Sequence, residues 1–128
     1  MAGRATPEGI LKDQVIGELE HLVSIGYRVQ WWCTHDDAPG IPDLIICAAG
    51  RYVALELKVD AKLDPRQELF LAQVADAEGI SAILKKYRDS TIGVTQYCLR
   101  HQYQSQHQSL PFALGYLFPD VPLTYLKR

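Results

Sequence analysis

Apolar positions near the start of the chain recur at the spacing of a helix. Four aliphatic side chains lie three or four residues apart, so they would share one helical face. These are Leu11, Val15, Leu19 and Leu22. The segment just before them, residues 6–8, reads Thr-Pro-Glu and offers an N-cap hydroxyl, a proline suited to the first helical position and an acid for the first turn. We therefore expect a helix from about Pro7 to Ser24, ending before Gly26.

Two apolar runs rich in Ile, Leu and Val flank a turn at residues 49–50 and predict a β-hairpin. If the loop is two residues long, or any even-numbered loop centred there, Ala48 pairs with Arg51. Counting outward along both strands then places Asp43 directly opposite Glu56, with their Cβ atoms about 5 Å apart. Alternation gives the second strand two faces. Tyr52, Ala54, Glu56 and Lys58 would share one face, and Val53, Leu55, Leu57 and Val59 would enter the core.

Three further segments complete the predicted core. Residues 27–34 are rich in β-branched and aromatic side chains and predict a strand before the hairpin. Residues 64–67 read Asp-Pro-Arg-Gln, the pattern of an N-cap, a proline at the first helical position and a capping-box glutamine. The helix that they open would end at Gly79, and residues 80–86 then predict another strand. The order of elements is therefore α-β-β-β-α-β.

The remainder of the chain has a weaker pattern. Residues 89–90 can cap a short helix that would run through about Arg100. Residues 101–109, with four glutamines, are expected to form an exposed connector. The tail beyond them carries aromatic side chains that we expect to pack in the core, a dimer contact being the alternative. They include Phe112, Tyr116, Phe118 and Tyr125.

A length of 128 residues, 48% of them hydrophobic, predicts one domain over residues 1–128, with a core at about 6–100 and a C-terminal extension at 101–128. The formal net charge of −2 excludes a polycation that coats nucleic acid indiscriminately. The N-terminus lacks the apolar stretch of a signal peptide. Prolines interrupt the longest apolar stretch, residues 110–126, so no membrane span is expected. Three cysteines without a C-x-x-C pair favour buried free thiols in a reducing cytoplasm.

The expected pairing of Asp43 with Glu56 carries the candidate chemistry. Like charges directly opposed on a sheet destabilise it, and carboxylates within Ile- and Leu-rich strands are costly unless they are neutralised. A divalent cation is the natural neutraliser, and two carboxylates with a backbone carbonyl and waters suit Mg²⁺. Lys58 would point to the same place and could orient the attacking water of a phosphodiester hydrolysis. The alternative is a cross-strand salt bridge between one carboxylate and Lys58.

Residues of the two predicted helices extend this candidate site. Glu8 continues the core-facing stripe of the first helix and is a candidate metal ligand, or else a first-turn carboxylate that interacts with the helix dipole. Gln67 either hydrogen-bonds the site or only completes the capping box. Lys62 and Arg66 lie near the N-terminus of the second helix, a place that favours an anion such as phosphate, and Lys85 adds a third basic residue for nucleic-acid binding.

Together these motifs resemble the PD-(D/E)XK nuclease superfamily and, within it, the virus-type replication-repair nuclease (VRR-NUC) domains. Four features match in order: an acid in the first helix, Gly-x-Pro-Asp-Leu at residues 40–44, an acid-x-Lys strand at residues 54–58, and Leu-Asp-Pro-Arg-Gln at residues 63–67. The match covers about residues 6–100. One departure is the segment at residues 59–62, which is short and carries an aspartate where family members often have a Gly-Lys-rich loop.

The resemblance implies a restriction-endonuclease-like α/β fold, with a mixed central sheet flanked by helices. It also implies a site for Mg²⁺ or Mn²⁺ in which Lys58 assists the attacking water and Gln67 supports the ligands. The ligands would be Asp43, Glu56, the Leu57 backbone carbonyl and, directly or through water, Glu8.

Members of this family include structure-selective DNA nucleases, some similar to Holliday-junction resolvases that work as homodimers, and short stand-alone domains resemble phage proteins. The leading hypothesis is therefore a metal-dependent endonuclease that acts on branched DNA in the cytoplasm of a bacterial or phage-infected cell. The alternatives are a nuclease for linear DNA and a catalytically silent module that binds nucleic acid or a protein partner. Opposed carboxylates would give a pure binding module no advantage. No P-loop or Gly-rich dinucleotide motif points to an organic cofactor.

Overall fold

The computed structural model describes residues 6–34, 40–48, 50–98 and 101–117. Its elements are α1 (Pro7–Ser24), β1 (Val29–Cys33), β2 (Leu44–Ala48), β3 (Arg51–Val59), α2 (Pro65–Asp76), β4 (Ile80–Lys86), β5 (Ile92–Cys98), β6 (His101–His107) and α3 (Leu110–Tyr116). The predicted order α-β-β-β-α-β is confirmed for the first six elements, and the first helix has the predicted bounds.

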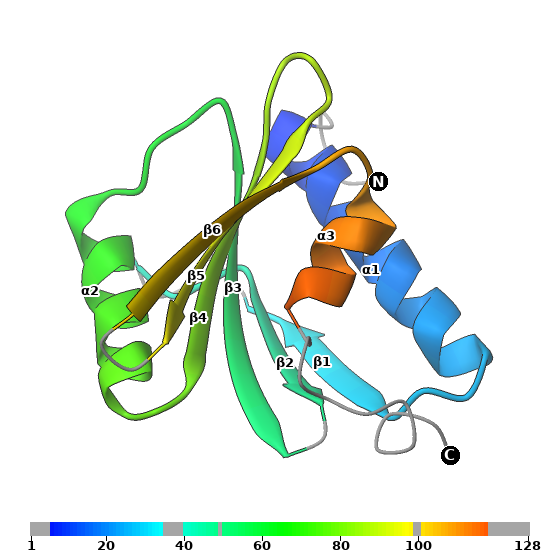
Figure 1. The fold of residues 1–128 in the computed structure, drawn as a ribbon, viewed down its shortest axis with the longest axis horizontal. Helices are drawn as coiled ribbons and strands as arrows, with labels where there is room; N and C mark the ends of the chain where they lie inside the picture. The colour runs from blue at the N-terminus through cyan, green and yellow to red at the C-terminus, as the bar shows by residue number, and fades with distance from the viewer. Residues whose placement is uncertain (1–5, 35–39, 49, 99–100, 118–128) are drawn as a thin grey trace.

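The strands form one six-stranded sheet in the order β1-β2-β3-β4-β5-β6. The pair β3–β4 is parallel and the other described pairs are antiparallel, so the sheet is mixed, as predicted. The parallel pair needs a crossover connection, which α2 provides. Figure 1 shows α2 on one side of the sheet and α1 and α3 on the other. The sheet therefore has two differently covered faces, an α2 face and an α1/α3 face.

The hairpin of β2 and β3 has the predicted register. Ala48 pairs with Arg51 and Leu44 pairs with Leu55, so one further step along both strands brings Asp43 opposite Glu56. The second strand also alternates as predicted, because Leu55 and Leu57 lie in the apolar core of the α1/α3 face. A loop that closed the hairpin with an odd number of residues would have moved these side chains to the opposite face.

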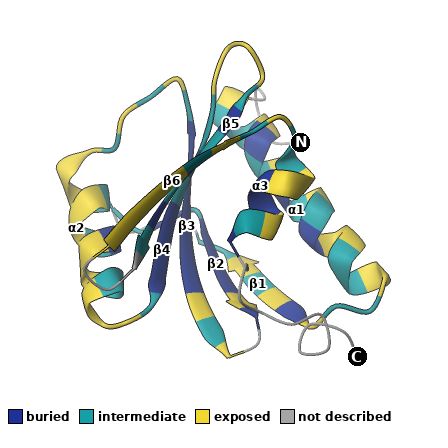
Figure 2. Ribbon diagram, in the orientation of Figure 1, coloured by how far each residue is buried: buried dark blue, intermediate teal, exposed yellow. Residues whose placement is uncertain are grey.

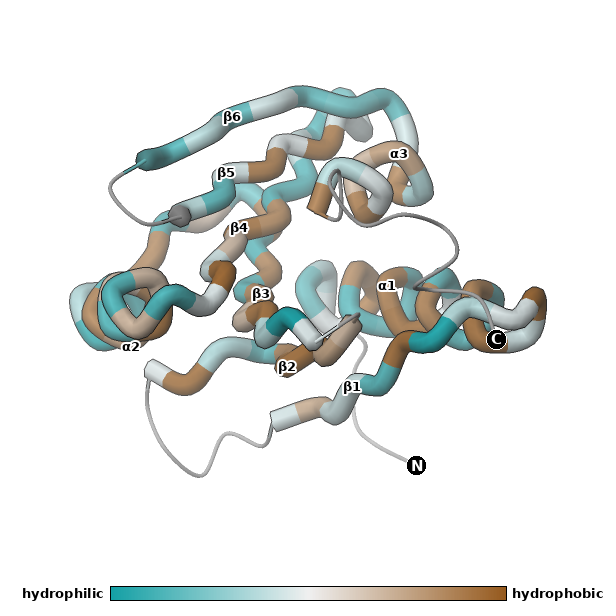
Figure 3. The backbone as a smooth tube through the Cα atoms, turned by 60° about the horizontal axis from the view of Figure 1, so that its bottom comes forward, coloured by the Kyte–Doolittle hydropathy of each residue, from teal (hydrophilic) through white to brown (hydrophobic). Residues whose placement is uncertain are grey.

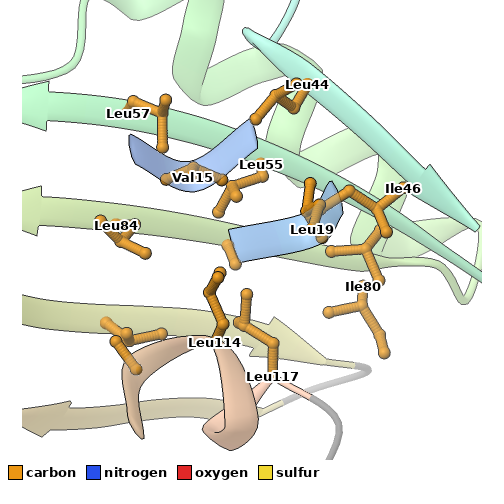
Figure 4. Close-up of a cluster of buried hydrophobic side chains, with 14 of the residues drawn as sticks. Val15, Leu19, Leu44, Ile46, Leu55, Leu57, Ile80, Leu84, Leu114 and Leu117 are labelled. Carbon is orange, nitrogen blue, oxygen red and sulfur yellow. The ribbon is translucent and has the colours of Figure 1, made fainter. Parts of the chain in front are cut away.

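The main core lies between the sheet and the helices α1 and α3. It contains Leu11, Val15 and Leu19 from α1 and Leu114 from α3, packed on the aliphatic side chains of the central strands (Figure 4). A smaller cluster on the α2 face joins Leu71 to strand residues such as Ile45 and Ala54. Burial is concentrated in the central strands, whereas β6 is mostly exposed (Figure 2). The α2 face thus leaves room for polar side chains that the α1/α3 face excludes.

Two expectations for the C-terminal part were wrong. In the segment expected to form a helix, residues 92–98 form strand β5, and most of the expected connector at residues 101–109 forms strand β6. The β-branched residues of segment 91–95 lose side-chain freedom in a helix and fit a pleated strand better. Strand β6 is an edge strand, hydrophilic along most of its length (Figure 3), and such a strand does not need an apolar face.

Expectations for individual side chains also needed correction. Phe112 was expected in the core but is 73% exposed, because α3 buries Ala113 and Leu114 instead. Tyr116 packs partly buried against the core. Phe118 and Tyr125 lie outside the described residues.

The thiols differ from the expected buried set. Cys33 is half-buried, but Cys47 is exposed. Cys47 pairs with Tyr52 across the hairpin on the α2 face, and both side chains are exposed there.

Among the described helices, none is long and apolar enough to cross a membrane.

The buried face of β3 yields a first prediction. Leu55→Ala should lower the free energy of unfolding by about 2–5 kcal/mol, because Leu55 is fully buried and its loss leaves a cavity under α1. Leu69→Ala on the exposed side of α2 is the matched control and should change the free energy by less than about 0.5 kcal/mol. Urea unfolding measures both, and equal midpoints would contradict the packing described.

Candidate active site

Asp43 is held at the start of β2 by contacts on both sides. The Thr34 amide donates to the Asp43 carbonyl at 3.1 Å, and the Thr34 hydroxyl donates to the carbonyl of the buried Pro42. The side chain is fixed as well, because its Oδ2 accepts from the Leu57 amide at 2.9 Å. Asp43 is thus tied through its backbone to the residue after β1 and through its carboxylate to β3.

Gly40, three residues before Asp43, packs against the start of α2. Its φ of 89° lies in the left-handed region that favours glycine. A Cβ on Gly40 would lie 2.9 Å from both the Cβ and the carbonyl oxygen of Arg66. A larger residue would therefore push the loop that carries Asp43 away from the start of α2.

Glu56 is the buried centre of the site. Its side chain comes from the middle of β3, and the residue is only 3% exposed. Its Oε1 accepts a hydrogen bond from Gln67 Nε2 at 3.2 Å. Its Oε2 is buried and has no hydrogen-bond partner among the residues that the structure describes. A buried carboxylate oxygen without a partner is costly, so this atom marks a place where a cation or a proton is needed.

Gln67 takes both of the roles between which the sequence could not decide. Its Oε1 accepts from the Asp64 amide at 3.0 Å, and the Asp64 carboxylate accepts from the Gln67 amide at 3.0 Å. These two bonds form the capping box of α2. The remaining amide group of Gln67 donates to Glu56. One side chain therefore links the start of α2 to the buried carboxylate.

Lys58 lies on the same face of β3 as Glu56. Its Nζ is 4.0 Å from Glu56 Oε1, at the limit of an ion pair, and the residue is 9% exposed. The alternative considered for these residues was a salt bridge of Lys58 with Asp43 or Glu56, and the contact with Glu56, which lies within β3, is the one that is present. No ion pair of Lys58 with Asp43 is present among the described residues. The amine remains close enough to act on a group held between the carboxylates.

The surroundings of Glu56 disfavour its charge. Burial, followed by hydrogen bonding to and repulsion from Asp43, raises its pKa from an ordinary value of 4.5 to about 9. Lys58 opposes this shift, and repulsion from Glu8 adds the smallest contribution to it. Two ionised carboxylates only repel each other, whereas a protonated Glu56 could donate a hydrogen bond to Asp43. Without a cation, Glu56 is protonated at neutral pH.

The donor set suits a hard divalent cation. Asp43 and Glu56 offer carboxylate oxygens from adjacent strands, and such cations prefer oxygen ligands and often take only one or two protein carboxylates. The unpartnered Glu56 Oε2 fits this interpretation. Glu8 is half-buried at the start of α1. Within the described part of the chain, however, no three His, Cys, Asp or Glu side chains gather as a metal cluster, so Glu8 does not complete a three-acid set there.

Neither a family model nor a curated protein matches the sequence. Among solved structures, the chain is similar to Hjc from Archaeoglobus fulgidus, described as a Holliday junction resolvase from an archaeal hyperthermophile. The two share 13% sequence identity with a TM-score of 0.46, over 83% of this chain and 99% of Hjc. The chemistry of the site therefore has to be inferred from the residues of this chain.

The predicted basic residues divide into two groups. Lys62 and Lys85 line one groove together with Lys58, and its volume is about 600 Å³. Lys58 and Lys85 are partners in the parallel pair β3–β4, which explains why they lie side by side. Arg66 is exposed at the start of α2 and is not among the residues that line the groove.

Sequence reasoning missed four residues around the site. They are Thr34, Tyr87, Gln104 and Gln106. Nothing in the sequence distinguishes Thr34 from an ordinary strand-end threonine. The glutamines had a usable signal, because glutamine at every second position from residue 102 to residue 108 has the period of a strand.

The raised pKa of Glu56 predicts how stability depends on pH in the absence of metal. Between about pH 4.5 and pH 9 the folded state holds a proton on Glu56 that the unfolded state has lost. Stability from this group is therefore fully present below pH 4.5 and is lost as the pH rises toward 9. Urea unfolding in EDTA should give falling midpoints over this range, and Glu56→Gln should flatten the fall. A variant with the same pH dependence as the wild type would contradict the assignment.

Proposed function

We propose that the protein is a divalent-metal-dependent DNA endonuclease of the PD-(D/E)XK type that hydrolyses phosphodiester bonds. The observation that carries this proposal is the buried Glu56 carboxylate facing Asp43, with one oxygen that no described residue satisfies. A protein gains nothing from opposing two acids in an apolar sheet unless a cation joins them. The Lys58 amine beside the pair adds the third part that hydrolysis requires.

Asp43, Glu56 and the Leu57 carbonyl would hold Mg²⁺ or Mn²⁺. When bound, the ion supplies a Lewis acid that makes a water molecule more acidic and offsets negative charge on the phosphate. Lys58 would orient the attacking water and stabilise the charge that develops in the transition state. Gln67 would hold Glu56 in place through its hydrogen bond. Glu8 would act on the site through water or by its charge.

We further propose branched DNA as the substrate and a homodimer as the working unit. The support is the order of motifs in the sequence, which resembles VRR-NUC domains. The location would be the cytoplasm of a bacterial or phage-infected cell. Lys62, Lys85 and the outlying Arg66 would contribute to DNA binding. A nuclease for linear DNA and a silent binding module are the competing functions, and the experiments below separate them.

Removal of either reactive side chain should abolish cleavage while the fold is retained. Glu56→Gln keeps the shape of the side chain, and Lys58→Met keeps most of the aliphatic stem. Each should lower the rate at least about a hundredfold, the usual effect of losing a catalytic acid or base. Two variants are matched controls and should cleave normally: Glu20→Gln, at an exposed position of α1, and Lys86→Met, on the α1/α3 face of the sheet. Full cleavage by purified Glu56→Gln would refute the assignment.

A panel of DNA substrates tests the substrate proposal. Four-way junctions, flaps, linear duplex and single strands should be compared in Mg²⁺, in Mn²⁺ and in EDTA. We expect cleavage with either metal, none in EDTA, and the highest rate on a branched substrate. Highest activity on linear duplex would support the linear-DNA alternative, and no cleavage of any substrate would support the silent module.

A further inference from the structure

Two rows of residues cross the α2 face of the sheet from the carboxylate pair toward the β6 edge. The pairing of the strands defines them. The first row is Glu56, Ile83, Thr95 and Gln104, and the second is Lys58, Lys85, Gly93 and Gln106. Beyond Glu56 the rows contain no further acid. The face that begins at the candidate active site therefore continues as a basic and then uncharged polar surface.

Every member of these rows except Glu56 lines the groove of about 600 Å³. Lys62 lines it from the segment between β3 and α2, and Tyr87 lines it from the end of β4. The charged residues of the lining are three lysines and one acid, Glu68, so the groove favours an anion. Lys58 belongs both to this lining and to the candidate active site, which makes the groove continuous with the site.

Tyr87 is a preorganised aromatic surface within the groove. The Nζ of Lys85 lies 5.3 Å from the centre of its ring, in a cation–π contact. The ring packs over Gly93, where a Cβ would approach Tyr87 Cε2 to 2.9 Å. The Tyr87 amide donates to the Thr91 carbonyl at 3.0 Å, which fixes the turn. The ring is nevertheless 38% exposed, so part of it is open to a ligand.

We propose that this groove binds an unpaired strand of DNA and leads it to the active site. The inference rests on the proposed function and adds the kind of DNA segment that the groove takes. Tyr87 would stack on a base, and Lys62 and Lys85 would contact phosphates. The uncharged side chains Gln104 and Gln106 would hydrogen-bond bases or sugars without demanding a sequence.

The groove suits one strand better than a double helix. Its volume lies within the range of pockets that hold small ligands, about 300–1,000 Å³, which fits a short stretch of a single strand. An aromatic ring can stack only on a base whose face is open, and in a duplex those faces are covered by neighbouring bases. Aromatic stacking combined with a basic track is the usual way in which proteins bind single strands without sequence preference.

Binding measured without cleavage tests this proposal. Fluorescence anisotropy in EDTA would compare a labelled oligothymidine with a blunt duplex of equal length. Wild-type protein should bind the single strand more tightly. Tyr87→Ala should weaken that binding by about tenfold or more, the size expected for the loss of one stacked base, whereas Tyr87→Phe should bind normally. Lys85→Ala should also weaken binding and reduce the salt slope by about 0.7.

Matched controls lie on the opposite face of the sheet. Lys86 follows Lys85 along β4 and lines a different pocket, beside α1. Tyr103 is an exposed tyrosine that precedes Gln104 along β6 and pairs with Gln96 of β5. Lys86→Ala and Tyr103→Ala should bind the single strand as the wild type does. If Tyr87→Ala is not folded, Tyr87→Leu removes the ring while keeping an apolar side chain.

The outcomes separate this proposal from the proposed function. Normal single-strand binding by folded Tyr87 and Lys85 variants would overturn the proposal that the groove binds DNA, whatever the cleavage assays show. Absence of single-strand binding by the wild type, or duplex binding of equal strength, would also overturn it. Groove-dependent binding by a wild type that cleaves no DNA would instead uphold the groove and refute the nuclease. Loss of cleavage in Glu56→Gln together with normal binding in the groove variants would instead uphold the nuclease and refute the groove.

Discussion

The site depends on one costly arrangement, the burial of Glu56 opposite Asp43 inside the sheet. Repulsion and desolvation both act on the Glu56 carboxylate, and its pKa rises to about 9 as a result. The protein can meet this cost with a proton or with a cation. A proton leaves Glu56 neutral, whereas a bound cation would keep the carboxylate ionised and offset the cost of its burial through ligand bonds. Metal affinity and proton affinity are therefore expected to compete at the same oxygens.

The neighbouring elements are arranged around this carboxylate. Gln67 closes the capping box of α2 and donates its remaining amide group to Glu56, so the start of the helix and the site share one side chain. Gly40 allows the loop that carries Asp43 to pack against Arg66 in the first turn of the same helix. A change that frays the start of α2 would thus disturb both carboxylates. Local helix stability and site geometry are coupled here by specific hydrogen bonds and not by proximity alone.

The sequence was most informative where a local rule left few choices. An even-numbered hairpin loop pairs Ala48 with Arg51, and counting outward from that pair determines that Asp43 lies opposite Glu56. For Gln67 the sequence offered two roles, and in the folded protein the amide oxygen takes one and the amide nitrogen the other. Strand β5 was taken for a helix although its β-branched residues favour a strand. Strand β6 was taken for a connector because an edge strand can be polar along most of its length. The alternating glutamines from residue 102 to residue 108 have the period of a strand, which emerges only when polar as well as apolar positions are counted.

The main core and the candidate site lie on opposite faces of the sheet. On the α1/α3 face strands β1 to β5 contribute residues to the main core, and these residues set stability. The α2 face is only partly covered, since α2 packs against β4 and β5 through Leu71 and its neighbours and leaves the rows toward β6 open. The parallel pair β3–β4 is decisive for this, because it places Lys85 in register with Lys58. The crossover connection therefore brings residue 85, a lysine in this chain, beside the site, and the helix within the same connection carries Gln67 to Glu56.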